Sequence, residues 1–251
     1  MTGSRARSVS LSTQRMLAAG LAAAALAAGA AGCGSTSGGT GGSTAANPLA
    51  SLSGAQIADK AVANLSKASS VHVAGTVTSS GQKIGLDLRL SHGKGCVGSM
   101  TLGGKGSFRL IAIGKKVWLK PNRKFWHSFG GSDPAVLKLL SGKYLKTTMS
   151  GQMGGLAKIC DPAELAGAFH EKGGHLTKGP VTTVAGQPAI KLTDNGDSSY
   201  AYVSATSTPQ LLQIAQPGSD GGQVNFTGYG DPVTLSPPPA AQTLDGKKYG
   251  F

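Results

Sequence analysis

The chain has 251 residues, of which 39% are hydrophobic and 5% aromatic, and its formal net charge is +13. A charge this basic favours anionic partners such as lipid headgroups, acidic wall polymers or nucleic acids. The N-terminus has the features of an export signal, which places the chain outside the cytoplasm and excludes nucleic acid as a partner.

Residues 1–32 have the pattern of a secretory signal. Arg5, Arg7 and Arg15 give a basic start without acidic residues, an apolar stretch covers residues 16–28, and small residues follow it. The stretch is too short and too rich in Ala to predict a helix that spans a membrane. Without these three arginines the formal charge falls from +13 to +10, and roughly 200 residues remain, enough for one domain with a core.

The end of this signal resembles the lipobox of bacterial lipoproteins. The four residues Ala30-Ala31-Gly32-Cys33 match it, although Ala stands where the commonest version has Leu. The resemblance implies cleavage before Cys33 and attachment of a palmitate-type acyl anchor to Cys33. The alternative is an ordinary secretory signal in which Cys33 occurs by chance.

Residues 33–50 predict a flexible tether between this anchor and a folded domain at residues 51–251. Residues 34–46 are almost wholly Gly, Ser, Thr and Ala, a composition that cannot bury a core. We therefore expect an extracytoplasmic protein that is anchored to the cell membrane by its N-terminal lipid.

The domain begins with a predicted helix and a series of strands. Ser53 and Gln56 form a capping-box pattern, and Ile57, Ala61 and Leu65 give the helix one apolar face up to about residue 68. Alternating apolar residues and tight turns then predict antiparallel strands. The expected strands are 71–78, 84–91, 96–102, 107–113, 116–120 and 125–127.

The middle of the chain predicts two short helices, and strands follow them. Asp133-Pro134 and Asp161-Pro162 are typical helix starts. Residues typical of strands then predict further strands at 175–184, 188–194, 200–204, 210–216 and 223–229, and a Pro-rich tail covers 232–239.

Two segments and this order of elements resemble the actinobacterial LppX/LprG group of lipoproteins, which share a fold with the LolA and LolB carriers. The segments are VTTVAGQPAI at 181–190 and YGDPVTL at 229–235, which runs into a Pro-rich stretch. The resemblance covers about residues 53–243. It implies an α+β fold, a curved antiparallel half-barrel sheet with helices packed against its concave side. It also implies a hydrophobic cavity for the acyl chains of lipids or lipoglycans, and it brings no catalytic residues.

The apolar faces of the first strands supply candidates for lining such a cavity. The candidates are Ile84, Leu86, Leu88, Leu90, Leu110, Val117 and Leu119. A core with few aromatic rings and 39 glycines fills its volume less easily, which leaves room for a ligand. The alternative is that these side chains pack against the helices.

Three cysteines are present, and an anchor on Cys33 leaves Cys96 and Cys160. Two cysteines in an oxidising compartment indicate a disulfide. The alternative, a metal or catalytic thiol, lacks a CxxC spacing and a surrounding ligand pattern.

Catalytic patterns are not found in the sequence. It contains no HExxH, no Gly-x-Ser-x-Gly and no Walker motif, and residues 194–197 are better interpreted as a hairpin turn than as a calcium loop. We therefore expect a non-enzyme that uses no cofactor and no metal.

One aromatic and basic segment leaves two interpretations open. Trp118, Phe125 and Trp126 lie among lysines and arginines, which suits either the membrane interface or a buried hairpin with basic edges.

Taken together, the sequence features favour a membrane-anchored lipid or lipoglycan binder. The alternative is a non-catalytic structural or interaction lipoprotein with a filled core and a basic surface, and the protein partners are unknown.

Overall fold

The computed structural model describes residues 47–79, 81–129, 133–150, 157, 159–170, 175–219 and 221–249. The described residues all belong to one compact unit, Thr44–Phe251. The predicted signal, Cys33 and tether residues 33–46 lie outside the described residues, so they stay predictions.

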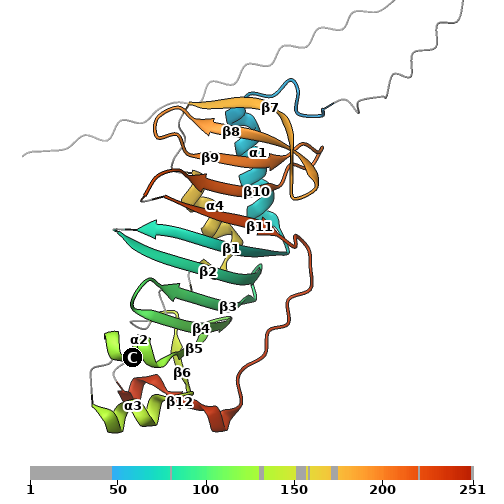
Figure 1. The fold of residues 1–251 in the computed structure, drawn as a ribbon. Helices are drawn as coiled ribbons and strands as arrows, with labels where there is room; N and C mark the ends of the chain where they lie inside the picture. The colour runs from blue at the N-terminus through green and yellow to red at the C-terminus, as the bar shows by residue number, and fades with distance from the viewer. Residues whose placement is uncertain are drawn as a thin grey trace, which may run out of the picture. The chain divides into compact units, whose positions relative to one another are not determined.

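In the described part of the chain, twelve strands form one sheet in the order β12-β6-β5-β4-β3-β2-β1-β11-β10-β9-β8-β7 (Figure 1). The strands are β1 (Ser70–Ser79), β2 (Gln82–Ser91), β3 (Gly95–Leu102), β4 (Gly106–Ile113), β5 (Lys116–Pro121), β6 (Tyr144–Thr148), β7 (Leu176–Val184), β8 (Gln187–Asp194), β9 (Tyr200–Ser204), β10 (Leu211–Gln216), β11 (Gly222–Thr227) and β12 (Thr243–Asp245). The sheet is open, and its two edges are β7 and β12.

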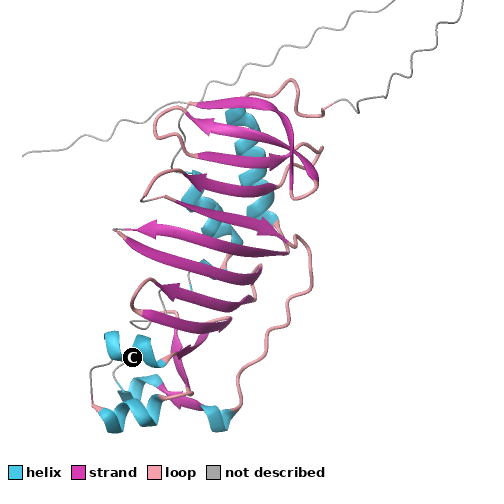
Figure 2. Ribbon diagram, in the orientation of Figure 1, coloured by secondary structure: helices cyan, strands magenta, loops and turns pink. Residues whose placement is uncertain are grey.

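Among the described residues, α-helices and short 3₁₀ helices accompany the sheet. They are α1 (Gly54–Lys67), α2 (Arg123–Phe129), α3 (Pro134–Leu140), α4 (Pro162–His170), η2 (Ala240–Gln242) and η3 (Gly246–Tyr249). Figure 2 shows α1 and α4 on one face of the sheet. None of the helices in the described residues is both long and apolar enough to cross a lipid bilayer.

The predicted helix starts are confirmed by their caps. The Ser53 hydroxyl accepts a hydrogen bond from the backbone of Gln56 at 3.2 Å, and the Gln56 side chain accepts one from the Ser53 backbone at 2.9 Å. Asp133 accepts from the backbone of Ala135, and Asp161 starts α4 in the same manner. These bonds satisfy backbone N–H groups that have no partner within the helix.

The predicted α+β class and antiparallel sheet are confirmed, with one addition. Neighbouring strands from β6 through β1 to β7 pair antiparallel, but β12 pairs parallel with β6. The sheet is therefore mixed. The addition comes from the segment after the Pro-rich tail, for which the sequence predicted no strand.

The predicted strand at 125–127 is wrong, because these residues belong to α2. The Asn122 side chain accepts a hydrogen bond from the backbone of Phe125 at 2.8 Å and donates one to the Ser107 hydroxyl at 2.9 Å. Asn122 thus caps a helix and fastens its start to β4, which turns the chain out of the sheet.

The start of the domain is fastened to the β7 edge. The Lys178 ammonium in β7 donates to the carbonyls of Ala50 at 2.6 Å and Leu52 at 2.7 Å, and Leu49 beside them is buried. The chain that leads in from the predicted tether therefore joins the domain at this edge of the sheet.

Candidate functional site

The seven predicted cavity residues lie on one face of β2, β4 and β5, which we call the inner face. The pairing register aligns them in cross-strand rows: Leu88 faces Gly98, Gly98 faces Leu110, and Leu110 faces Leu119. Leu90 and Val117 belong to the next row, with Cys96 and Ala112 between them; Ile84 and Leu86 extend the face along β2. The structure therefore brings all seven together in one apolar patch.

This patch is closed in the structure. Leu88, Leu90, Leu110, Val117 and Leu119 are each 0% exposed, and Ile84 and Leu86 are partly buried against the same core. Solvent reaches none of these five side chains, so they are packed against protein atoms. An acyl chain on this face would therefore have to replace contacts that protein side chains now make.

Strand β3 completes the patch with residues that the sequence analysis did not select. Cys96 and Met100 are buried on the inner face, and Gly98 lies between Leu88 and Leu110. A Cβ at Gly98 would collide with the backbone of β2 at Asp87 and Leu88. The row therefore has no side-chain bulk at its second position, where the two strands approach closely.

A disulfide between Cys96 and Cys160 joins the inner face to the segment before α4. The two Cα atoms are 5.1 Å apart, and 64 positions separate the residues in the sequence. Ala157 is buried, and Ile159 packs against the same core. The bond therefore fixes this segment against β3, on the side of the sheet where α4 lies (Figure 1).

Helix α1 covers the other half of the inner face, whereas α2 packs against β4, where Phe125 contacts Phe108. α1 packs against α4 and against β7, β9 and β10, and it buries Ile57, Ala61 and Leu65 there. The partly buried side chains that adjoin the core include Leu137, Met149 and Ile159, which follow β5 in the chain. The two halves of the sheet thus bury their inner faces against different segments.

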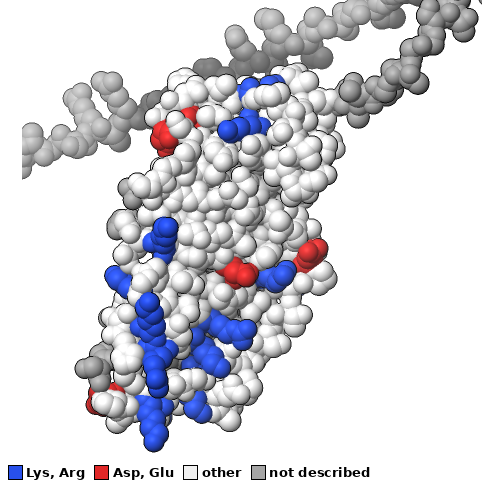
Figure 3. Space-filling view, in the orientation of Figure 1, with Lys and Arg blue, Asp and Glu red and all other residues white. Residues whose placement is uncertain are grey.

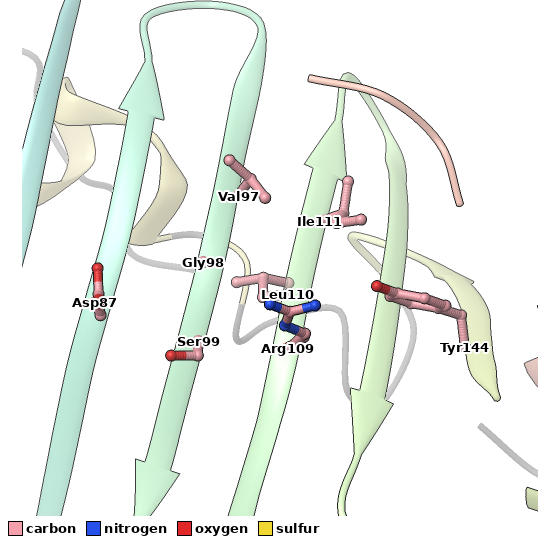
Figure 4. A pocket seen from close by; sticks show the side chains of 8 residues that line it. All are labelled: Asp87, Val97, Gly98, Ser99, Arg109, Leu110, Ile111 and Tyr144. Atoms are coloured by element: carbon pink, nitrogen blue, oxygen red, sulfur yellow. The ribbon is translucent and has the colours of Figure 1, made fainter. Parts of the chain in front are cut away.

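The opposite, outer face of β2–β6 carries a hollow of about 380 Å³ (Figure 4). Arg109 and Asp87 supply charges at its wall, Val97 and Ile111 supply apolar groups, and the Tyr144 ring closes one side. On the same face the Lys120 ammonium lies 5.2 Å from the centre of the Tyr144 ring. This hollow is small, open and mixed in polarity, which does not suit a buried acyl chain.

Two histidines of the described chain lie beside carboxylates. His72 is hydrogen-bonded to Asp87 at 2.8 Å, and His92 lies 3.8 Å from Asp161. Among the described residues no group of three His, Cys, Asp or Glu side chains could hold a metal ion. The other ring nitrogen of His72 lies 3.3 Å from the Thr227 hydroxyl, so Asp87, His72 and Thr227 form one hydrogen-bonded row across β2, β1 and β11.

The aromatic and basic segment of the sequence is mostly buried. Trp118, Phe125 and Trp126 are 6%, 3% and 1% exposed, and Phe125 makes edge-on ring contacts with Phe108 and Trp126. The interpretation that these three rings face a membrane is therefore wrong. The structure confirms the alternative, in which the rings are buried and have basic neighbours. The element that buries Phe125 and Trp126 is helix α2 rather than a hairpin.

The Tyr-Gly-x-Pro-Val segment also has a structural role. The Tyr229 hydroxyl donates to the Leu211 carbonyl in β10 at 2.8 Å, and the Ser70 hydroxyl donates to the Asp231 carbonyl at 2.6 Å. Burial raises the pKa of Tyr229 well above its usual range. The segment thus fastens the end of β11 to the sheet before the chain leaves along the Pro-rich tail.

No protein-family model matches the chain, and no curated protein matches it either. Among solved structures, LprF from Mycobacterium bovis is similar, with 15% identity and a TM-score of 0.51, over 74% of this chain and 96% of LprF. The lipoprotein LppX from Mycobacterium tuberculosis has 13% identity and a TM-score of 0.41, over 73% of this chain and 98% of LppX. The likeness to LprF confirms the resemblance expected from the sequence at the level of the fold.

Proposed function

We propose that the chain is a membrane-anchored lipoprotein of the cell envelope that binds acyl chains of a lipid or lipoglycan on the inner face of β2–β5. The supporting observation is the continuous apolar patch that Leu88, Leu110 and Leu119 form across these strands. The LprF-like fold and the lipobox at Cys33 agree with it. The role is binding or transfer, without catalysis, metal or cofactor.

The free energy gained by burying an acyl chain is large enough for such binding, although the patch is closed. Burial of an acyl chain gains about 0.8 kcal/mol for each CH₂ group, so ten groups gain about 8 kcal/mol before costs are subtracted. The chain replaces apolar contacts now made by residues such as Met149 and Ile159. The net affinity is therefore the difference in free energy between the acyl chain packed on this face and the protein side chains packed on it.

One observation favours a second function, an interaction lipoprotein with a filled core. The five completely buried candidate side chains are what such a core requires, and the outer face of the same strands carries Arg109, Lys116 and Lys120. In that case the outer face would be the functional surface. The two functions differ in whether lipid accompanies the folded protein.

Mass spectrometry of the full chain purified from its own envelope tests both the anchor and the ligand. Under denaturing conditions we expect a mature N-terminus at Cys33 with an acyl-bearing mass, absent from Cys33→Ala. Under native conditions we expect a further mass of one lipid that dissociates without breaking a covalent bond. A folded protein with no such lipid, in the native spectrum or in an organic extract, would favour the second function.

A further inference from the structure

The positive charge of this protein is concentrated in one stretch of the chain. Residues 83–148 contain thirteen of the 24 Lys and Arg residues but only two of the 11 Asp and Glu residues. This stretch covers β2 to β6 with α2 and α3, and Figure 3 shows the resulting gathering of Lys and Arg toward that end of the sheet. Without residues 83–148 and the signal, basic and acidic residues nearly balance.

The exposed apolar side chains gather at the same end. Five large hydrophobic residues of the described chain are at least 36% exposed, and four of them lie in α2, α3 and η3. These four are Phe129 (51%), Val136 (36%), Leu139 (46%) and Tyr249 (36%). The fifth, Val181 (48%), lies in β7 at the opposite edge of the sheet.

The three elements that carry these side chains lie close together, and we call them the apolar tip. Residues of α2 and α3, Trp126 and Leu137 among them, line one hollow of about 480 Å³. η3 directly follows β12, which pairs with β6 at the sheet edge. Figure 1 shows α2, α3 and β12 gathered at that end of the sheet.

Exposed cations surround the apolar tip. Arg123 and Lys124 belong to α2, Lys138 to α3, and Lys247 and Lys248 to η3, and all five are exposed. The Lys105 ammonium of the neighbouring β3–β4 turn lies 5.9 Å from the centre of the Phe129 ring. Asp133 and Asp245 are the acidic residues beside them, so the tip is apolar and strongly basic together.

We infer that the apolar tip inserts into the interface of an anionic lipid bilayer. A basic surface alone would suit any polyanion, but exposed Phe, Leu and Val side chains gain free energy only in an apolar phase. Near an anionic surface each Lys or Arg contributes about 1 kcal/mol. A bilayer that contains anionic lipid supplies both the charged surface and the apolar phase.

The tip and residues 49–52 at the start of the domain lie at opposite edges of the sheet. Lys178 fastens the start of the domain to β7, and the tip adjoins β12. Twelve strands at about 4.8 Å spacing separate these edges by roughly 50 Å. The tip therefore provides a membrane contact distinct from the lipid on Cys33. This inference stands without the acyl ligand of the inner face, because it uses other residues.

Vesicle flotation of the mature-length chain with Cys33→Ser, which carries no anchor, tests the inference. Vesicles of phosphatidylglycerol mixed with phosphatidylcholine should bind the protein, and pure phosphatidylcholine should bind it far more weakly. Phe129→Ser should weaken binding about tenfold, and Lys124→Gln about fivefold. The controls are Val181→Ser, at an apolar residue that is 48% exposed against 51% for Phe129, and Lys67→Gln, at another exposed lysine; both positions lie outside the tip.

Three outcomes would overturn the inference. Equal binding to both vesicle types excludes an anionic bilayer as the partner. Binding that Lys124→Gln weakens and Phe129→Ser does not indicates adhesion to any polyanion, which a parallel assay on an acidic polysaccharide would detect. An equal effect of Val181→Ser and Phe129→Ser removes the tip as the contact. Thermal unfolding of each variant checks that it is folded.

Discussion

Replacing Leu110 by Trp should remove most of the lipid from the purified protein. Leu110 lies in the centre of the inner face, between Leu119 and the side-chain-free position Gly98. The indole ring would extend over Gly98 into the path proposed for an acyl chain. We expect lipid content, measured by native mass spectrometry, to fall about tenfold, with an overpacking cost of about 1–3 kcal/mol in the free energy of unfolding.

The control for this variant is the next residue of the same strand. Ile111 points to the outer face, where it lines the small open hollow, so Ile111→Trp adds the same ring on the other side of β4 (Figure 4). We expect Ile111→Trp to keep its lipid. If both variants keep it, or if wild type carries none while Leu110→Trp is strongly destabilised, the inner face is a packed core.

Replacing Cys160 by Ser should lower the free energy of unfolding by about 4 kcal/mol, because the disulfide with Cys96 closes a loop of about 64 residues in the unfolded chain. The midpoint of thermal unfolding should fall by about 10 °C. The bond also holds Ile159 and Ala157 against the inner face, so the variant should release bound lipid more readily.

Reduction gives an independent check of the disulfide. Wild type in excess reductant should unfold at the temperature of Cys160→Ser, and Cys96→Ser should match both, because each change removes the same bond. The disulfide would be absent from the purified protein if reductant leaves the unfolding midpoint of wild type unchanged and two thiols react under native conditions.

Local signals were sufficient for most of the fold. Three predicted features depend only on residues close in sequence: the capping box at Ser53, the Asp-Pro helix starts and the alternating strands. The structure confirms all three. The patch was also predictable, since alternation places Leu86, Leu88 and Leu90 on one face of a strand.

Other features depend on partners that are remote in the sequence. Asn122 caps α2 and also bonds Ser107, which lies beside it across the β4–β5 pair. The local Asn-Arg signal carries no information on Ser107, and it favoured a hairpin turn instead. β12 is a strand because β6 offers it an edge, about 100 residues away. The apolar tip joins α2 and α3 with η3, which no local pattern connects.

The most direct test of the central claim, acyl chains on the inner face of β2–β5, is photo-crosslinking with a fatty acid that carries a diazirine on its acyl chain. After irradiation and digestion, we predict labelled peptides from β2, β4 and β5 that contain Leu88, Leu110 or Leu119, and competition by unlabelled lipid. Labelling confined to α2, α3 or the outer face, or labelling that competitor lipid leaves unchanged, would contradict the claim.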